Sequence, residues 1–444
     1  MAAAGLAVAV IAVLALLAGA HRYLWRRLVG DTTARGSALR GAGTVAAYVL
    51  PLLSVGALVA GRAGAPFWLQ RVLAWPGYLW LAAVLYLTLA LLVGEAVRPL
   101  LRRVLAGRAD RMKGAYADPG AGVHAGVDPR PAEGAPLTHP SHGADRPETT
   151  APAAPATLLA DAPAPARRDA PTRRLFVARA VGGAAAVAGL GTVGYGTYGV
   201  LRGPRVKRIT VPLAKLPRSA HGFRIAVVSD IHLGPILGRA HTRRIVDTIN
   251  RTQPDLVAVV GDLVDGTVAD LGPAAEPLAR LRSRQGSFFV TGNHEYYSGA
   301  AEWVDQVREL GLHPLENARV EIGGFDLAGV NDVAGESEGQ GPDFARALGD
   351  RDRTRAAVLL AHQPVVIHDA VAHGVDLQLS GHTHGGQLWP GNYLADLANP
   401  TGAGLDRYGD TQLYVSRGAG AWGPPVRVGA PSDITVVELA SLRA

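Results

Sequence analysis

Residue types that bind metal ions recur along the second half of the chain at spacings that suit metal chemistry. Asp230-Ile231-His232 and His382-Thr383-His384 each place two such side chains two positions apart. In an extended segment, residues two apart point to the same side, so each pair could bind one cation. Because the chain has no cysteine, any metal must be held by imidazole, carboxylate or amide groups.

A third motif, Gly261-Asp262-Leu263-Val264-Asp265, offers a carboxylate that two cations could share. A bridging carboxylate holds two ions close together while it offsets their repulsion, and Asp262 is the candidate for this role. The glycine beside it lets backbone and ligand approach closely. Asp265 has two interpretations: a partner that orients a metal ligand, or the cap of a following helix.

Two further segments, Gly292-Asn293-His294-Glu295 and Ala361-His362-Gln363-Pro364, carry groups of the same kinds. Taken alone, His362 could be an ordinary buried histidine and Asn293 could cap a turn. A chance match of all five motifs is improbable, so together they favour a metal site. Mixed nitrogen and oxygen ligands suit manganese, iron or zinc ions better than magnesium or calcium.

Each motif follows a short run of β-branched residues that predicts a strand. The expected strands are 224–229, 256–260, 287–290, 356–360 and 377–379, with helices at 239–251, 300–310 and 365–373. This alternation predicts an α/β core, and alternating segments at 320–330, 412–416 and 434–439 predict that a mixed or antiparallel sheet completes it. Since ligands at strand ends converge on one edge of a sheet, the motifs should meet there.

In this order, the five motifs resemble those of the calcineurin-like metallophosphoesterase superfamily over residues 225–421. The resemblance implies an αββα sandwich and hydrolysis of phosphoric esters with two metal ions. One ion would be bound by Asp230, His232 and His384, the other by Asn293, His362 and His382, with Asp262 shared between them. Two cations ~3.5–4 Å apart could polarise a phosphoryl group and lower the pKa of a bridging water.

The same resemblance implies a catalytic role for His294, which would lie near the phosphate without binding a metal. It would act as a general acid or as an electrostatic stabiliser of the leaving oxygen. The retained His294 also argues against an alternative function, a metal-binding membrane receptor or scaffold with weak catalysis.

Differences from the superfamily's motifs, and similarities to one of its subgroups, narrow the class of substrate that we expect. Protein Ser/Thr phosphatases of this superfamily carry an arginine where this chain has Gly266, which disfavours a phosphoprotein substrate. Segments 293–297, 361–364 and 385–387 look most similar to a bacterial, membrane-associated subgroup. That subgroup includes twin-arginine-exported phosphoesterases and enzymes that hydrolyse UDP-diacylglucosamine, which implies a lipid-linked or envelope phosphoester. Arg417 could bind a substrate phosphate or be a solvated turn residue.

The first half of the chain is expected to be membranous. Residues 2–20, 43–61 and 78–97 are apolar stretches near the ~20 residues that a membrane span requires. A cleaved signal peptide is disfavoured for the first because no basic residue precedes it. A fourth segment, 175–201, follows Arg173-Arg174 and resembles either a twin-arginine export signal or an ordinary span.

The expected domains are therefore a transmembrane region (1–105), a disordered Pro/Ala-rich linker (106–172), a fourth membrane helix (173–201) and a catalytic domain (205–444). Arginines are dense after the first and third stretches, which places those loops in the cytoplasm and the catalytic domain on the external face of the cell membrane. Four basic residues at 202–208 argue against this topology. The net charge of +7 arises mostly from these topology signals, so nucleic acid is not an expected partner.

Overall fold

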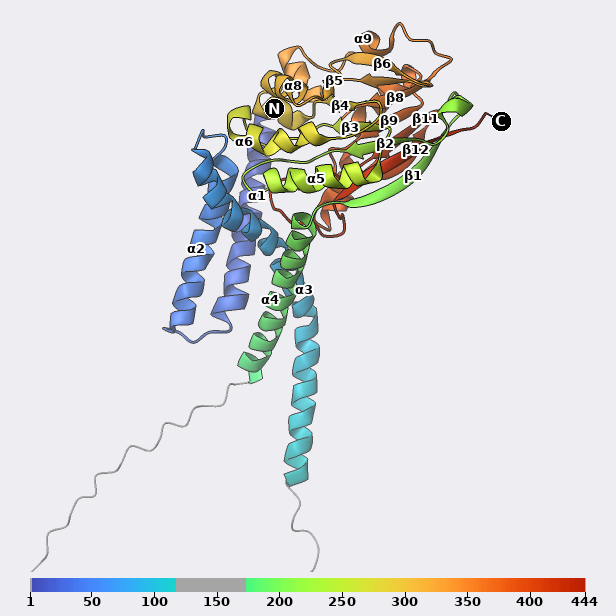
Figure 1. Cartoon of the computed structure of the whole chain (residues 1–444). Coiled ribbons are helices and arrows are strands. Elements are labelled where there is room, and N and C mark those ends of the chain that lie inside the picture. The colour runs from blue at the N-terminus through green and yellow to red at the C-terminus, as the bar shows by residue number, and fades with distance from the viewer. Residues whose placement is uncertain (1, 117–172, 444) are drawn as a thin grey trace, which may run out of the picture. The chain divides into compact units, whose positions relative to one another are not determined.

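The computed structural model describes residues 2–116 and 173–443 (Figure 1). The chain divides into two compact units, one comprising Met1–Glu95 and Ala178–Ala444 and the other lying within Ala96–Val177. The first unit holds the C-terminal domain, where all five motifs lie.

The C-terminal domain contains two six-stranded sheets. The first has the order β1-β12-β2-β3-β4-β5 and consists of β1 (Arg205–Leu213), β2 (Phe223–Val228), β3 (Leu256–Val260), β4 (Ser287–Val290), β5 (His313–Pro314) and β12 (Asp433–Ser441). The second has the order β10-β11-β9-β8-β7-β6 and consists of β6 (Ala318–Ile322), β7 (Phe325–Gly329), β8 (Ala356–Leu360), β9 (Leu377–Ser380), β10 (Gly404–Tyr408) and β11 (Thr411–Val415). Both sheets are mixed, with β2, β3 and β4 parallel in one and β8 and β9 parallel in the other.

The two sheets pack face to face, and helices cover their outer faces. Val227 and Val260 of the first sheet share one buried cluster with Leu327, Val358 and Leu379 of the second. Helices α5 (Arg239–Thr252), α6 (Val268–Ala275) and α8 (Ala300–Glu309) pack on the first sheet, while α9 (Phe344–Leu348) and α10 (Ile367–Ala372) pack on the second. This arrangement confirms the predicted α/β class and αββα sandwich.

Some elements differ from the sequence prediction. Strand β1 was not expected, because its charged residues obscure the apolar alternation, and it pairs in parallel with β12 from the far end of the chain. The segment expected at 320–330 is a hairpin of β6 and β7, which turns at Gly324 with a φ of 108°. Short elements complete the domain: α7 (Asn293–Ser298), α11 (Gly391–Ala398) and the 3-10 turns Arg218–Ala220, Glu276–Arg280, Val333–Glu338, Pro364–Val366 and His384–Gly386.

The N-terminal half is helical. It consists of α1 (Ala2–Leu24), a π-helical turn (Trp25–Gly30), α2 (Ala38–Val59), α3 (Phe67–Tyr116) and α4 (Arg173–Leu201). Among the described residues, three segments are long and apolar enough to cross a membrane: Ala38–Val59, Phe67–Arg108 and Arg173–Leu201. The first expected span falls in α1.

Helix α3 is longer than expected. It continues to Tyr116, so residues 106–116 of the expected linker are helical, and residues 117–172 lie outside the described residues. Alanine, arginine, methionine and lysine dominate this extension and favour helix. At Glu95, α3 contacts the π-helical turn, where the Arg27 Nε lies 2.9 Å from the Glu95 carboxylate.

Candidate metal centre

The five motifs follow five strands, three in the first sheet and two in the second. Asp230 and His232 follow β2, Asp262 follows β3, Asn293 follows β4, His362 follows β8, and His382 and His384 follow β9. Because the carboxyl ends of parallel strands meet at one edge, both sheets direct these loops to the same place.

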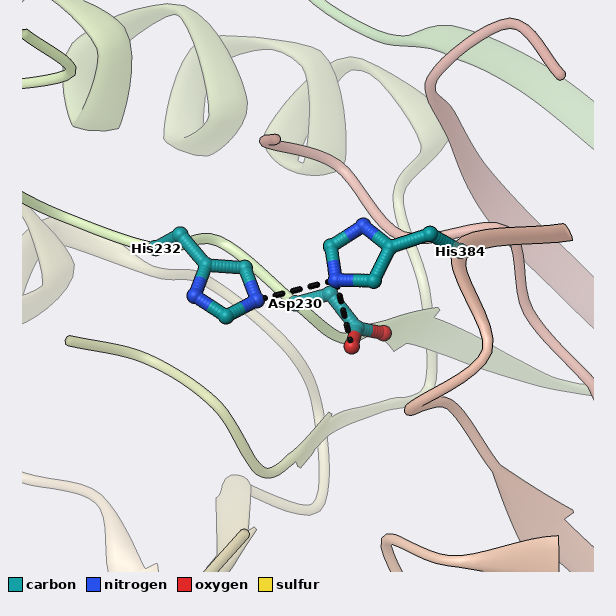
Figure 2. A group of neighbouring side chains, drawn as sticks. All are labelled: Asp230, His232 and His384. Atoms are coloured by element: carbon teal, nitrogen blue, oxygen red, sulfur yellow. Dashed lines mark hydrogen bonds and ion pairs between the residues drawn. The ribbon is translucent and has the colours of Figure 1, made fainter. Parts of the chain in front are cut away.

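Asp230, His232 and His384 form one buried group (Figure 2). The His232 Nε2 lies 3.0 Å from the His384 Nε2, and the His384 Nε2 lies 3.4 Å from the Asp230 Oδ1. Two imidazole nitrogens and a carboxylate that converge in this way could hold one metal ion.

A second group joins Asp262, His362 and His382. The His362 Nε2 lies 3.1 Å from the Asp262 Oδ2, and the Asn293 Oδ1 lies 3.0 Å from the His382 Nδ1. The amide oxygen of Asn293 therefore joins the nitrogen and carboxylate donors of this group.

Asp262 lies between the two groups. Its Oδ2 is 3.1 Å from the His362 Nε2 of one group and 3.7 Å from the His232 Nε2 of the other. Burial alone would raise the pKa of this carboxyl, but neighbouring His362 and His232 hold it well below its usual range. The structure thus brings all seven predicted ligands together around an ionised Asp262.

The donor set fits a metal ion. The His362 Nδ1 lies 2.9 Å from the Val260 carbonyl oxygen, which can only accept a hydrogen bond, so Nδ1 carries a proton and Nε2 is the nitrogen that faces the site. That Nε2 is buried and makes no hydrogen bond. Burial would lower the pKa of His362, but Asp262 raises it well above its usual value, so a metal ion bound between Nε2 and Asp262 would take the place of a proton.

The backbone at the site is strained. Among the described residues, eight other than glycine have a positive φ, and five of these are predicted ligands: Asp230, His232, Asp262, His382 and His384. Each such conformation costs roughly 1–3 kcal/mol and persists only where the surroundings impose it. Here the loops hold one another, since the His232 amide donates to the Asp262 carbonyl and the His382 amide donates to the Asp230 carboxylate.

Two glycines make this close approach possible. A Cβ at Gly292 would collide with the Asp262 carboxylate, and one at Gly381 would collide with the Ser229 hydroxyl. Both glycines directly precede a predicted ligand, so their motifs require them for space.

Asp265 contacts two histidines at once. Its carboxylate lies 3.1 Å from the His232 Nδ1 and 2.6 Å from the His294 Nδ1. Burial opposes ionisation of Asp265, but the interaction with His232 outweighs it and lowers the pKa to about 2. Of the two interpretations made from the sequence, this geometry fits a residue that orients a ligand.

His294 lies at the opening of the site. Its side chain is 15% exposed, and its Nε2 lies 4.0 Å from the Asp262 Oδ2. The structure also groups it with His232 and Asp262 as a set that could hold a metal ion, a role not expected from the sequence. The rings of Tyr297 and Trp422 flank it.

The histidines at the site have divergent proton affinities. Burial would lower the pKa of His232, but Asp265 and Asp262 raise it to about 9. Burial lowers the pKa of His382 to about 4, assisted by the positive charge of His362. The free site therefore already holds at least one proton at neutral pH.

Sequence reasoning assigned no role to two buried residues that shape the site. The Glu295 carboxylate accepts hydrogen bonds from the amides of Gly292, Asp262 and Leu263. Burial, and then repulsion by Asp262, raise the pKa of Glu295 to about 7. It fixes the loop that presents the shared carboxylate.

Arg427 holds the other side of the site. Its guanidinium donates to the His384 carbonyl at 3.2 Å and to the His384 Nδ1 at 2.9 Å. The His384 Nδ1 therefore faces Arg427, and its Nε2 is the nitrogen that faces Asp230 and His232, where a metal ion could bind.

Comparison with known proteins agrees with this geometry. Residues 223–386 match the family model described as calcineurin-like phosphoesterase. A Helicobacter pylori metallophosphoesterase is 39% identical over 256 residues, which cover 56% of this chain and 68% of that protein. An Aquifex aeolicus metallophosphoesterase is 35% identical over 240 residues, which cover 53% of this chain and 91% of that protein.

A vertebrate relative is named as a transmembrane protein. The Danio rerio "transmembrane protein with metallophosphoesterase domain" is 39% identical over 259 residues, covering 55% of this chain. The match spans 59% of that protein, so the similarity covers little more than half of its length.

Proposed function

This chain belongs to the calcineurin-like metallophosphoesterase family, and from that premise we propose that it is a membrane-anchored hydrolase of phosphoric esters that uses two metal ions. The observation that carries the proposal is the convergence of seven donor side chains from five strand ends around Asp262. The five loops follow five different strands of two sheets, so the convergence depends on the whole sandwich.

Asp230, His232 and His384 would hold one metal ion, and Asn293, His362 and His382 the other, with Asp262 bound to both. When bound, manganese, iron or zinc ions supply Lewis-acid polarisation of the phosphoryl group. The chain itself supplies the rest: a buried, ionised bridge at Asp262 and imidazoles whose orientation is fixed by hydrogen bonds to Asp265, Val260 and Arg427.

His294 would donate a proton to the leaving oxygen of the ester. Its Nδ1 faces the Asp265 carboxylate, which leaves Nε2 directed toward the centre of the site. A carboxylate at this distance fixes the orientation of the ring. Asp265 thus acts through His294 and His232 as a positioning residue.

The proposed substrate is a lipid-linked or envelope phosphoester, cleaved at a phosphomonoester, phosphodiester or pyrophosphate bond. The three long apolar helices and the transmembrane relative support a membrane location. The distribution of arginines supports a multi-pass topology with the catalytic domain on the external face. Gly266, in place of an arginine, supports a substrate other than a phosphoprotein.

Metal analysis and hydrolysis assays on the purified full-length chain test the proposal. We expect two bound metal ions per chain and hydrolysis of bis(p-nitrophenyl) phosphate or p-nitrophenyl phosphate. The His384→Ala variant should lose metal binding and hydrolysis. The His368→Ala variant, which alters an exposed histidine on α10, should retain metal binding and hydrolysis. A chain that binds two metals but hydrolyses neither ester would instead support the receptor or scaffold function.

A further inference from the structure

The catalytic domain exposes large apolar side chains beside its candidate metal centre. Five of them form what we term the apolar rim: Trp389, Tyr393, Leu394, Leu397 and Trp422. Leu394 is 70% exposed and Leu397 is 85% exposed, and helix α11 has no buried residue. Exposed leucines lose the free energy that burial would contribute, so such a cluster indicates an interaction surface.

The apolar rim is attached directly to the long apolar helices. The Tyr86 hydroxyl of α3 donates a 3.0 Å hydrogen bond to the carbonyl of Trp389, two residues before α11 begins. Leu388 and Val428 pack in the same cluster as Leu87 and Val193 of α3 and α4. The segment that carries α11 is therefore fixed beside the helices.

Helix α4 comes especially close to this segment. A Cβ at Gly196 would lie 3.0 Å from the Arg427 carbonyl oxygen, so the helix and the loop approach at a distance that glycine permits. On either side of Gly196, Tyr195 and Tyr198 are 73% and 62% exposed. Aromatic residues with a polar tip are enriched where a helix leaves the bilayer.

The rim and these tyrosines thus belong to segments that contact each other. We propose that the apolar rim lies in the lipid–water interface where the end of α4 leaves the membrane, with α11 parallel to the surface. An amphipathic helix in this position buries its apolar face ~5–10 Å into the boundary between headgroups and acyl chains. The partner is a phospholipid surface, and it covers the side chains that the protein leaves exposed.

This placement gives a route from the lipid to the metal centre. A crevice of about 300 Å³ is lined by Gly385, Trp389, Asn392, Arg417 and Val428, among others. Gly385 directly follows the predicted ligand His384, and Trp389 belongs to the apolar rim. The Asn392 Oδ1 in the crevice is buried without a hydrogen-bond partner.

Arg417 contributes a charge to the same crevice. No hydrogen bond or ion pair of its guanidinium occurs within the described part of the chain. A lipid phosphate could enter from the bilayer, pair with Arg417 and reach the metal centre without leaving the interface. This route rests on the proposed hydrolase function, whereas the position of the rim does not.

Fluorescence quenching in proteoliposomes tests the position of the rim. Because the chain has no cysteine, Leu397→Cys can be labelled singly with a nitrobenzoxadiazole fluorophore in the full-length protein. The matched control is Leu442→Cys, at an exposed leucine beyond β12. The vesicles contain phosphatidylcholine and phosphatidylglycerol, with or without a phosphatidylcholine that carries a nitroxide on its acyl chain.

We expect the nitroxide lipid to quench the label at 397 several times more strongly than the label at 442, and aqueous iodide to show the reverse order. Equal iodide quenching at both positions, without lipid quenching at 397, would overturn the inference. If Leu397→Cys does not fold, the label at Tyr393→Cys decides in the same way. Hydrolysis of p-nitrophenyl phosphate by the same samples is scored separately, so loss of the proposed function leaves the quenching result interpretable.

Discussion

The five strand-end loops and the N-terminal helices differ in how strictly their structure depends on the identity of each residue. In the loops, single atoms of His362 and His232 lie within 4 Å of the Asp262 carboxylate, and the backbone is strained to bring them there. In the helices, leucine, valine and alanine recur around the whole circumference, and many of these side chains are exposed. The first region is specified by residue identity at fixed positions, and the second by length and hydrophobicity.

This contrast predicts opposite responses to substitution, and the largest should occur at Asp262. Asp262→Asn keeps the shape of the side chain but removes the negative charge that would lie between two cations. We expect loss of at least one metal ion and a fall in hydrolysis well beyond the ~10–100-fold that substitutions of residues supporting metal ligands cause. Metal analysis beside p-nitrophenyl phosphate kinetics measures both; unchanged turnover would contradict the role of Asp262.

The second-largest effect is expected at His294 in the strand-end loops, where a substitution can separate metal binding from proton transfer. His294→Ala should keep the metal content but lower kcat by roughly 10²–10⁴-fold, the range of a general acid. A loss of metal with the rate would show that His294 is a ligand, as its grouping with His232 and Asp262 also allows.

The strand-end loops should also respond to pH, which the helices should not. The pKa of His232 is raised to about 9, so below that pH a metal must displace a proton from this ring. Apparent metal affinity should therefore rise between pH 7 and 9, by up to about tenfold per pH unit, and level off above the pKa. Zinc titrations at fixed pH values measure this slope. A metal affinity that stays constant between pH 7 and 9 would show that His232 is not positively charged in the metal-free site.

A smaller effect is expected at Asp265, which contacts ligands but would not bind the metal. Asp265→Asn should lower the hydrolysis rate by ~10–100-fold. It should also flatten the pH dependence of metal binding, because Asp265 is the main group that raises the pKa of His232. Kinetics and zinc titration of this one variant test both effects. A loss of folding, seen by circular dichroism, would instead indicate a purely structural role.

The smallest effect is expected on the exposed side of α2. Leu52 is 70% exposed, and Leu52→Ala should change stability by no more than about 0.5 kcal/mol and leave hydrolysis unaltered. Gly77→Leu is the matched contrast, because a Cβ there would lie 2.5 Å from the Leu53 carbonyl oxygen. Thermal unfolding of both variants in detergent would show whether only the substitution at the helix contact lowers stability. A large loss of stability in Leu52→Ala would contradict the contrast between the loops and the helices.

The strand-end loops were also the region that the sequence predicted best. Residue type and spacing identify the pairs Asp230/His232 and His382/His384 in the sequence, and β-branched runs mark the strands before them. The structure brings all seven predicted ligands together, and their binding of metal stays a prediction. What the sequence could predict was therefore set by local patterns.

Residues that act through distant contacts could not be predicted in this way. Glu295 holds the amide of Asp262, 33 positions away, and Arg427 holds His384, 43 positions away. Neither contact leaves a periodic pattern, although the glutamate in Asn293-His294-Glu295 was visible in the motif itself. Strand β1 was missed because its charged residues obscure the apolar alternation, and its partner β12 lies far along the chain.

The central claim is that one aspartate joins two metal ions, and anomalous X-ray diffraction from crystals grown with manganese tests it most directly. We expect two anomalous peaks ~3.5–4 Å apart, on either side of the Asp262 carboxylate. A single peak, or peaks remote from Asp262, would contradict it.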